Sequence, residues 1–394
     1  MQLLHVISSM SPLSGGTSQA IRNIIPNLES LNVKNDVVCL DAKDQDYGLK
    51  DNFNVYKIGK GKTSYQYSPL LTDWFLKKLQ YYDVVVVHGI WQYANYGIYK
   101  AIKKVKKSKS KLPKVIIMPH GMLDPYFQKA ADRKWKALRN EIVWRLTEKK
   151  AINAADAVFF TCEEELNLAR TTFRGYKPKL AINVGIGIPN PPAETTEMRS
   201  AFKLLSPSVP NNYWLFLSRI HPKKGIDLLI TAYNNLCLKT RNIPDLVIAG
   251  PTHSLYAEEM IALAKDNSKI HFVGMLSGKA KWGAFYGCQA YLLPSHQENF
   301  GIAIVEAMAC EKPVLITKNI NIWREIQADN SGWILEDLTV ASIEQQLQEI
   351  AALPVAKIKQ TGRQAKQTFE DKFNVRNQSK IFVATLNNVI KPEC

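Results

Sequence analysis

The sequence predicts an α/β fold made of two doubly wound, Rossmann-like domains. Apolar runs of strand length alternate with segments of helix length, and this alternation is interrupted once before it restarts. Strands that are separated by helices pair in parallel, which produces the βαβ units of a doubly wound sheet. The expected strands are 3–8, 36–40, 83–88, 114–118, 157–161 and 180–184, followed by 213–218, 245–249, 270–273, 290–293, 313–317 and 333–335.

The composition of the strands indicates sheets that are covered on both faces. Four consecutive valines occupy the run 83–88, where a half-exposed strand would alternate apolar with polar residues. Segments with helical periodicity separate the strands of the second half, and we expect them to cover its sheet. They lie at 225–238, 255–265, 301–310, 341–352 and 356–371.

The interruption of the alternation marks a domain boundary. The chain has 394 residues, which is more than one hydrophobic core usually supports. A proline-rich run at 189–192 is followed by a polar stretch to about residue 211, so we expect a hinge near 189–211. The first domain is therefore expected at 1–190 and the second at 191–374. A further amphipathic helix is expected at about 375–390.

Composition narrows the class of protein without choosing a function. The formal net charge is +16, which indicates a polyanionic partner such as nucleic acid, an anionic membrane surface or a pyrophosphate-bearing substrate. The sequence has no run of about 18 uncharged apolar residues, and its first residues predict a buried strand instead of a signal peptide. The six cysteines are scattered without metal-ligand spacing, which is typical of a cytoplasmic protein. We therefore expect neither a bound metal nor another cofactor.

The segment that follows the strand at 290–293 is the strongest candidate for a ligand site. A loop with Glu298 and Gly301 leads into a helix, whose free N–H groups and positive dipole end favour a phosphate. Glu306 lies about one and a half turns into that helix, where a carboxylate can accept hydrogen bonds from both hydroxyls of a ribose. The alternative is that Glu298 is a solvated loop residue and Glu306 a surface residue of the helix.

The segment that follows the strand at 213–218 is basic. Arg219 and Lys224 come before a helix that begins near Gly225. Arginine supplies a fork of donors and lysine a point charge, a combination suited to a diphosphate. A solvated basic loop is the alternative. The position favours phosphate binding, because open parallel sheets bind ligands outside the carboxyl ends of their strands.

The first domain has glycines and histidines at the ends of its strands. Gly15 and Gly16 lie between the first strand and a helix, in a weaker pattern than a dinucleotide-binding fingerprint. Two strands end in His-Gly, at His88 and His120, and Trp91 follows the first of them. A lone histidine is more often structural, but a pair at strand ends can hydrogen-bond a sugar hydroxyl or a developing charge.

Together these motifs resemble the retaining GT-B glycosyltransferases of family four, a large group that builds bacterial polysaccharides and glycolipids. The resemblance spans nearly the whole chain, and the second half is its most specific part. It rests on Gly15-Gly16, His120-Gly121, Ser218-Arg219 through Lys224-Gly225, Glu298 and Glu306 with seven residues between them, Glu-Ala-Met-Ala at 306–309, and Gly332-Trp333. It implies two domains that face each other across a cleft, with residues of about 375–394 crossing back onto the first domain.

The resemblance implies that the second domain binds a nucleotide-sugar donor. Arg219 and Lys224 would neutralise its diphosphate and help the nucleotide to leave, and Glu306 would hold the ribose. The loop around Met275, after the strand at 270–273, would take the base. Pro222 and Lys223 fill a spacing that varies in the family, so Lys224 is chosen because Gly225 follows it. The remaining implied contacts, to the donor sugar and phosphate, are Glu298, Asn299, Phe300 and Gly301.

The resemblance assigns the acceptor to the first domain. Gly15 and Gly16 would allow this domain to close over the phosphate, and His120 would contact the donor sugar near its anomeric carbon. His88 and Trp91 are the residues that we expect to contact the acceptor.

The implied reaction transfers a hexosyl unit with retention of its anomeric configuration. The acceptor would be a saccharide or lipid-linked saccharide of polysaccharide biosynthesis, and a UDP-sugar such as UDP-glucose is favoured as donor by family frequency alone. The implied mechanism is front-face displacement, in which the leaving phosphate takes the proton of the acceptor. Arginine and lysine would replace a divalent metal ion in this mechanism. It requires no protein base, which agrees with the lack of an obvious base–nucleophile pair in the sequence.

Two basic segments of the first domain predict a surface for an anionic membrane. The range Lys100–Lys114 is rich in lysine, and the range 129–152 combines basic residues with apolar residues close to helical spacing. These apolar residues are Trp135, Leu138, Ile142, Leu146 and Ile152. Basic amphipathic helices with tryptophan bind membrane interfaces, although the same stripe could simply pack on the sheet. The protein would then be cytoplasmic and peripheral on the inner face of the plasma membrane.

Other functions stay open from the sequence alone. A nucleotide-sugar epimerase has the same fold and needs no acceptor, whereas a glycogen-type phosphorylase would need a pyridoxal-phosphate lysine and a longer chain. A basic membrane-binding or nucleic-acid-binding protein would also account for the charge. We expect no nucleic-acid partner, because the lysine runs lack interleaved aromatic residues and the sequence has no recognised nucleic-acid motif. The fold cannot separate these functions, so the site must.

Overall fold

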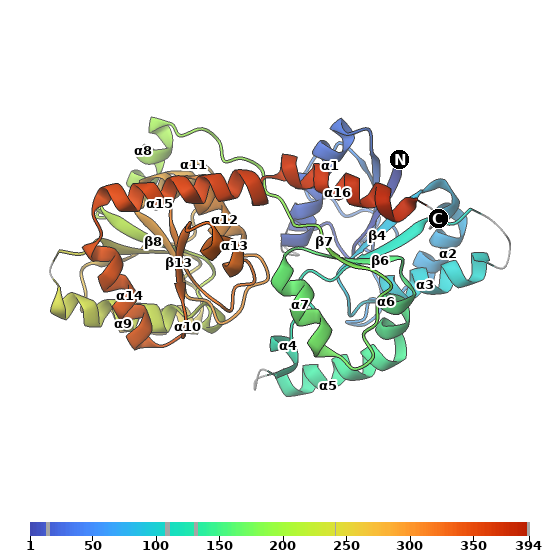
Figure 1. The fold of residues 1–394 in the computed structure, drawn as a ribbon, viewed down its shortest axis with the longest axis horizontal. Helices are drawn as coiled ribbons and strands as arrows, with labels where there is room; N and C mark the ends of the chain where they lie inside the picture. Colours follow the sequence, from blue (N-terminus) through green and yellow to red (C-terminus); the bar gives the residue numbers. More distant parts are fainter. Residues whose placement is uncertain (13–15, 107–110, 130–132, 241, 392–394) are drawn as a thin grey trace. The chain divides into compact units, whose positions relative to one another are not determined.

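The computed structural model divides the chain into two compact units (Figure 1). It describes residues 1–12, 16–106, 111–129, 133–240 and 242–391. Unit 1 consists of Met1–Pro189 together with Val375–Cys394, and unit 2 is Asn190–Asn374. The chain thus leaves unit 1 before residue 190 and returns to it for its last helix.

The described part of unit 1 contains a seven-stranded parallel sheet in the order β3-β2-β1-β4-β5-β6-β7. Its strands are β1 (Gln2–Val6), β2 (Lys34–Cys39), β3 (Asn54–Lys57), β4 (Val84–His88), β5 (Lys114–Met118), β6 (Ala157–Phe160) and β7 (Ala181–Asn183). The strand order reverses between β1 and β4. Such a switch point is where open parallel sheets bind their ligands.

Helices cover both faces of this sheet. Val85 and Val87 of β4 pack in one core cluster with residues of α2 and α3, while Val84 and Val86 pack in another with Phe382 and residues of α1. Because successive strand residues enter different clusters, the strand is apolar throughout instead of alternating. The helices are α1 (Gly16–Ser30), α2 (Pro69–Lys78), α3 (Tyr93–Val105), α4 (Tyr126–Lys129), α5 (Lys134–Val143), α6 (Lys149–Ala154), α7 (Glu163–Thr172) and α16 (Val375–Ile390), with a short 3₁₀ helix η2 (Leu79–Tyr81) and a π-helix η5 (Trp144–Glu148).

The last helix, α16, is part of the core of unit 1. It lies beside α1 on one face of the sheet (Figure 1). Phe382 and Leu386 of α16 are buried, and the Phe382 ring meets that of Phe159 in β6 edge-on, with 5.8 Å between the ring centroids.

Unit 2 has a parallel sheet in the order β10-β9-β8-β11-β12-β13, which reverses between β8 and β11. Its strands are β8 (Tyr213–Leu217), β9 (Asp245–Ala249), β10 (Ile270–Phe272), β11 (Ala290–Leu293), β12 (Val314–Thr317) and β13 (Gly332–Leu335). Its helical segments are α8 (Thr196–Leu205), η6 (Pro222–Lys224), α9 (Ile226–Lys239), α10 (Leu255–Ala264), α11 (Gly278–Gly287), α12 (Ile302–Ala309), α13 (Trp323–Ala328), α14 (Val340–Ala352), α15 (Val355–Thr368) and η7 (Phe369–Phe373).

These two sheets confirm the predicted α/β fold with two doubly wound parallel sheets. Each expected strand is present, but the short strand β3 at the edge of its sheet was not predicted. The two units divide between Pro189 and Asn190, at the start of the range near which a hinge was expected. Residues Thr196–Leu205 form α8, which packs on α11 of unit 2 and buries Met198 and Phe202.

Candidate functional site

Two loops leave the sheet of unit 2 at its switch point, one after β8 and one after β11. Lys224 follows β8 and is buried, and its ammonium group forms an ion pair with the carboxylate of Glu298, which follows β11. Ser295 Oγ also lies 3.2 Å from Glu298 Oε1. Arg219 is exposed near the end of β8. The switch point therefore brings together two charged residues that the sequence placed 74 positions apart.

A glycine allows these two loops to approach closely. Gly225 ends η6 with φ of +63°, and a Cβ atom at this position would lie 2.1 Å from the carbonyl oxygen of Pro294. Backbone and side-chain hydrogen bonds tie the loops together: His296 N and Ser295 Oγ both donate to Lys223 O, at 2.8 and 2.9 Å. The position of Lys224 beside Glu298 thus depends on a residue without a side chain.

Glu306 has a basic partner that the sequence did not reveal. Lys281 of α11 lies 2.6 Å from Glu306 Oε1, and the two side chains are only 24% and 15% exposed. Burial raises the pKa of Glu306, and the Lys281 ammonium opposes that rise. Glu298 is similarly sheltered, with 16% of its side chain exposed. The alternative of two solvated acids is therefore wrong.

The other residues predicted for the donor occupy varied environments. Met275 is 74% exposed after β10. Phe300 is buried edge-on against Phe373, so it can offer a ligand only its backbone. Asn299 Oδ1 accepts a hydrogen bond of 3.3 Å from Asn321. Gly301 is the N-cap of α12 and has φ of +76°, where a residue with a side chain would be strained.

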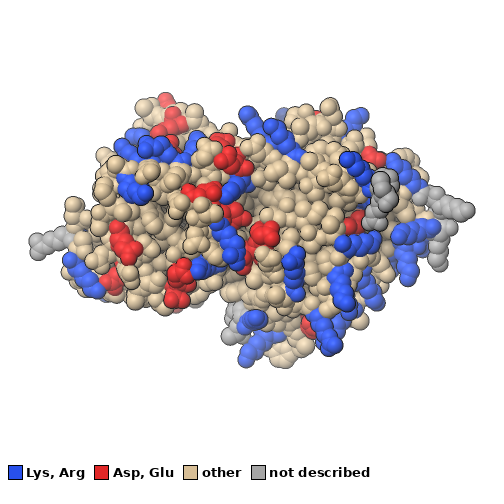
Figure 2. Space-filling model, viewed as in Figure 1, with Lys and Arg blue, Asp and Glu red and all other residues tan. Residues whose placement is uncertain are grey.

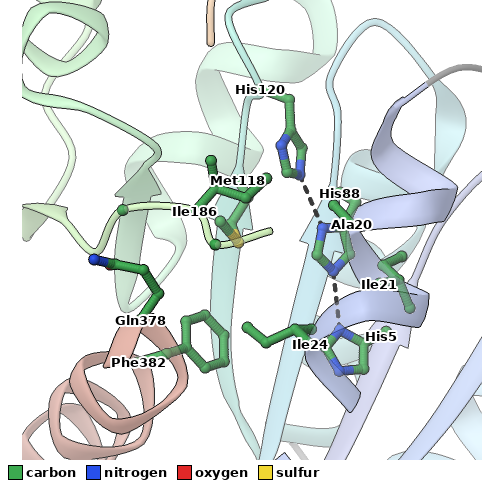
Figure 3. A pocket seen from close by; sticks show the side chains of 12 residues that line it. His5, Ala20, Ile21, Ile24, His88, Met118, His120, Ile186, Gln378 and Phe382 are labelled. Carbon is green, nitrogen blue, oxygen red and sulfur yellow. Dashed lines mark hydrogen bonds between the residues drawn. The ribbon is translucent and has the colours of Figure 1, made fainter. Parts of the chain in front are cut away.

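In unit 1, three histidines form a hydrogen-bonded row (Figure 3). His120 follows β5, and its Nε2 lies 2.9 Å from Nδ1 of His88 at the end of β4. His88 Nε2 lies 3.0 Å from Nδ1 of His5 in β1. The rings stack in pairs, each with centroids 5.2 Å apart. His5 was not predicted as a site residue, although a histidine inside an apolar strand was the signal available.

The histidines remain uncharged at neutral pH. Burial lowers the pKa of His5 and of His120 to about 4. The pKa of His88 is lowered by burial first and by its two histidine neighbours second. The row therefore consists of neutral imidazoles, each of which carries one N–H donor and one bare nitrogen.

The backbone at His120 is held in an uncommon conformation. His120 has φ of +52° and Gly121 has φ of +80°. Buried Glu165 of α7 accepts hydrogen bonds from Gly121 N at 2.5 Å and from Thr161 Oγ1 at 2.6 Å. A non-glycine residue with positive φ persists only where surrounding contacts hold it, and Glu165 provides such contacts.

The histidine row lines a pocket of unit 1 whose other walls come from distant parts of the chain (Figure 3). α1 contributes Ala20, Ile21 and Ile24, and α16 contributes Gln378 and Phe382. The loop after β7 fits closely against α16, because a Cβ atom on Gly185 would lie 2.1 Å from Gln378 Oε1. Gly16 is the first residue of α1, and Gly15 lies outside the described residues.

The two residues predicted to contact the acceptor are engaged within unit 1. Both ring nitrogens of His88 are bonded to other histidines, so its side chain holds its neighbours instead of offering a nitrogen to an acceptor. Trp91 is half-buried, with its ring on Phe173 and its indole N–H donating to Met122 O at 3.3 Å. An acceptor contact of Trp91 stays a prediction.

Acidic side chains do not gather into a metal site in the described part of the chain, where no group of three or more His, Cys, Asp or Glu residues could hold a metal ion. An Asp-x-Asp triplet is present at 44–46, in an exposed loop after β2. Asp46 of this triplet accepts a hydrogen bond of 2.9 Å from Gly48 N.

Comparison with solved structures first defines the class of fold. Anabaena HepE, crystallised with UDP and glucose, superposes with a TM-score of 0.74 over 98% of this chain and 100% of its own, at 17% sequence identity. Sucrose-phosphate synthase from Thermosynechococcus elongatus superposes with a TM-score of 0.73 over 99% of both chains, at 16% identity. The protein therefore has the GT-B fold.

Comparison with sequences then gives the family. Residues 201–368 match the model of the "Glycosyl transferases group 1" family, and these residues carry Arg219, Lys224, Glu298 and Glu306. The match assigns this domain to the group 1 glycosyltransferases, and together with the fold it confirms the predicted resemblance to a GT-B glycosyltransferase family.

Curated relatives match only a part of this chain. An uncharacterised glycosyltransferase from Methanocaldococcus jannaschii is 32% identical over 108 residues, which are 27% of this chain and 29% of that protein. The serotype-specific mannosyltransferase WbdA from Escherichia coli is 30% identical over 107 residues, which are 26% of this chain and 13% of its own length. The match thus spans less than a third of either relative.

Proposed function

We propose that this protein transfers a hexosyl unit from a nucleotide-diphosphate sugar to a saccharide or lipid-linked saccharide, with retention of the anomeric configuration. The observation that carries the proposal is the arrangement at the switch point of unit 2. There the buried Lys224–Glu298 pair and the exposed Arg219 lie within a group 1 glycosyltransferase domain.

Each charged residue of the candidate site in unit 2 has a chemical role in this proposal. Arg219 and Lys224 neutralise the charge that develops on the leaving diphosphate, which is the main electrostatic requirement of the transfer. Glu306 accepts hydrogen bonds from the ribose hydroxyls, and Lys281 favours its ionised form. Glu298 orients Lys224 and the hydroxyls of the donor sugar. The leaving phosphate takes the proton of the acceptor hydroxyl, so neither a metal ion nor a protein base is required.

UDP is the nucleotide that we favour. HepE, which shares the fold, was crystallised with UDP and with UDP-glucose. The exposed Met275 after β10 offers an apolar surface to a base. Because WbdA is named a mannosyltransferase, guanine nucleotides belong in the same test.

A thermal-shift assay with UDP, GDP, ADP and their sugar conjugates, with and without EDTA, tests the donor site. A ligand that binds the native state raises Tm by mass action. We expect one nucleotide to raise Tm in the presence of EDTA, and Lys224→Met to reduce this shift. Lys265→Met removes an exposed lysine of the same unit and should leave the shift unchanged. If none of the nucleotides shifts the wild-type protein, the proposed donor site is wrong.

Product analysis tests the transfer itself. With the donor that binds, NMR of the product should show the same anomeric configuration as the donor sugar. The opposite anomer would contradict retention. Conversion of UDP-N-acetylglucosamine without any acceptor would instead indicate an epimerase.

A surface of unit 1 supports the proposal of a membrane-bound acceptor. Trp135, Leu138, Ile142 and Leu146 recur at helical spacing along α5 and η5, and they are 86%, 53%, 51% and 61% exposed. The alternative that this stripe packs on the sheet is therefore wrong, although Ile152 of α6 is buried.

Basic residues flank the exposed stripe. Lys134, Lys136, Arg139 and Arg145 are exposed on α5 and η5, and Figure 2 shows Lys and Arg side chains gathered over the lower part of unit 1. Apolar side chains with a tryptophan, surrounded by cations, suit the interface of an anionic bilayer. Among the described residues, no helix is both long and apolar enough to cross a membrane.

Co-sedimentation with vesicles of phosphatidylcholine, with and without phosphatidylglycerol, tests this association. We expect the protein to bind the anionic vesicles, and Trp135→Glu to weaken that binding. Leu238→Glu alters a side chain of unit 2 that is 89% exposed and serves as the matched control. Equal binding to both kinds of vesicle would contradict the proposal.

A further inference from the structure

The histidine row of unit 1 ends on an asparagine whose orientation is fixed. Asn35 lies in β2, is 6% exposed, and its Nδ2 is 2.7 Å from the carbonyl oxygen of Val33. A carbonyl oxygen only accepts hydrogen bonds, so the atom of Asn35 that faces Val33 must be the amide nitrogen. The amide oxygen therefore faces His5, and Asn35 Oδ1 lies 3.3 Å from His5 Nε2.

This orientation determines the proton position on each imidazole in turn. Asn35 Oδ1 is an acceptor, so His5 must carry its proton on Nε2 and leave Nδ1 bare. The bare Nδ1 of His5 requires a proton on Nε2 of His88, and the bare Nδ1 of His88 requires a proton on Nε2 of His120. Each neutral imidazole carries one N–H proton. Only one assignment of these protons therefore satisfies every hydrogen bond of the row.

We propose that Asn35 and His5 are positioning residues that hold His120 in the Nε2–H tautomer. His120 then presents a bare Nδ1, which is a hydrogen-bond acceptor, in the pocket that it lines with α1 and α16. Such a nitrogen recognises a hydroxyl group and repels an anionic oxygen. In the proposed reaction His120 thus accepts a hydrogen bond from a sugar hydroxyl, a consequence that rests on the proposed function.

The surroundings of the row oppose any other arrangement. Ile24, Met118 and Phe382 line the same pocket with apolar side chains, so an additional proton on the row would be poorly solvated (Figure 3). A second proton on His5 or His88 would also direct two N–H groups at each other across one of the hydrogen bonds. The orientation of the Asn35 amide therefore determines the tautomers of all three histidines in the row.

NMR of the full-length protein with ¹⁵N-labelled histidine tests the proposal without reference to activity. Long-range ¹H–¹⁵N spectra distinguish the two tautomers and the charged form, and single substitutions among the seven histidines assign the signals. At neutral pH we expect His5, His88 and His120 all to show the Nε2–H tautomer. An Nδ1–H tautomer or a charged ring at any of the three would overturn the proposal, whatever the protein catalyses.

Variants of Asn35 show whether the asparagine causes this order. Asn35→Leu removes the acceptor, and we expect His120 to show a mixture of tautomers. Asn54→Leu changes an asparagine on the neighbouring strand β3 and serves as the control. Unchanged His120 signals in folded Asn35→Leu would contradict the proposal.

Kinetics connect the tautomer to the reaction. In Asn35→Leu, loss of one oriented hydrogen bond should lower kcat about tenfold, with KM for the donor nearly unchanged. A change in KM alone, with His120 reordered, would show that the hydrogen bond to His120 serves substrate binding, which would overturn its expected part in the chemical step.

Discussion

At the scale of single residues, unit 2 has two sheltered ion pairs, Lys224 with Glu298 and Lys281 with Glu306. The side chains of Lys224 and Glu298 are only 11% and 16% exposed. Each charge is therefore compensated mainly by the other and not by water. Removing one partner of a buried pair usually costs more than removing both, because it leaves a buried charge alone.

We therefore expect Lys224→Met to lower the free energy of unfolding by roughly 3 kcal/mol. The double variant Lys224→Met/Glu298→Gln should recover a large part of this loss, as it removes both charges. Urea unfolding followed by circular dichroism measures both values. Equal stability of the single and double variants would indicate that the pair is solvated and that its role is confined to ligand binding.

Glu148 in η5 provides a second test at this scale. Burial raises the pKa of Glu148 to about 8, and neither of its carboxylate oxygens has a hydrogen-bond partner of good geometry among the described residues. The folded protein therefore retains a proton that the unfolded chain loses near pH 4.5. Between these values the free energy of unfolding should decrease as the pH rises, by about 1.4 kcal/mol per pH unit.

Glu148→Gln should remove this dependence and become progressively more stable than the wild type from pH 5 to pH 8. Parallel urea titrations at several pH values measure the difference. Glu141→Gln, which alters a partly exposed member of a surface pair with Arg145, should follow the wild-type curve. A constant difference between Glu148→Gln and wild type would show that Glu148 is ionised in the folded protein.

Sequence patterns could predict only some of the site residues. Lys224 and Glu298 follow strands and Glu306 lies within the next helix, so the pattern of elements together with the family resemblance was enough to select them. Lys281 could not be found, because its helix α11 has glycines at both ends and within it and lacks a recognisable periodicity. His5 and Asn35 acquire their importance only through partners on neighbouring strands, which single-sequence reasoning cannot place.

At the scale of elements, the close approach of η6 to the loop after β11 positions Lys224 and depends on Gly225. Gly225→Ala would place a Cβ atom 2.1 Å from Pro294 O in addition to straining a residue with φ of +63°. We expect a loss of roughly 3 kcal/mol in stability together with a weaker nucleotide-dependent thermal shift, because Lys224 would move.

Gly274→Ala is the matched control. Gly274 has φ of +70° but no atom within 4 Å of its Cβ position in the described structure, so this variant adds strain without a clash. Its loss should be about 1 kcal/mol. Similar losses in the two variants would mean that the contact with Pro294 relaxes easily.

The elements that were missed share a physical reason. Strand β3 is four residues long at a sheet edge, and none of its residues is fully buried, so its pattern is weak. Helix α8 follows a proline-rich run whose polar character masked it. Periodicity also predicted the apolar stripe on α5 correctly. It could not predict whether the stripe is buried or exposed, because the same spacing of apolar residues suits contact with a sheet or with a membrane.

At the scale of the whole molecule, unit 1 depends on a helix that follows unit 2 in the chain. Phe382 is 3% exposed in the core of unit 1, while its neighbour Ile381 is 45% exposed. We expect Phe382→Ala to lower the free energy of unfolding by about 3–5 kcal/mol, and Ile381→Ala to have little effect.

Differential scanning calorimetry compares the two variants. The transition of unit 1 should shift to lower temperature in Phe382→Ala, and a nucleotide that binds unit 2 identifies the other transition. Equal effects of Phe382→Ala and Ile381→Ala would show that α16 is only loosely attached to unit 1.

The overall architecture was the most predictable feature, because parallel sheets require long apolar strands and regularly spaced helices. The tasks of the two units were not predictable from these patterns. The net charge of +16 indicated a polyanionic partner, but only the exposure of the stripe on α5 favours a membrane over other polyanions.

The return of α16 to unit 1 has a consequence for biosynthesis. A ribosome synthesises residues 190–374 before it adds residue 375, so the sequence of unit 2 is complete while unit 1 still lacks α16. The usual order, in which the first domain made is the first to fold, cannot hold in full here. Until translation ends, the apolar surface that Phe382 and Leu386 will cover stays open, and nascent unit 1 is the part of the chain that a chaperone would protect.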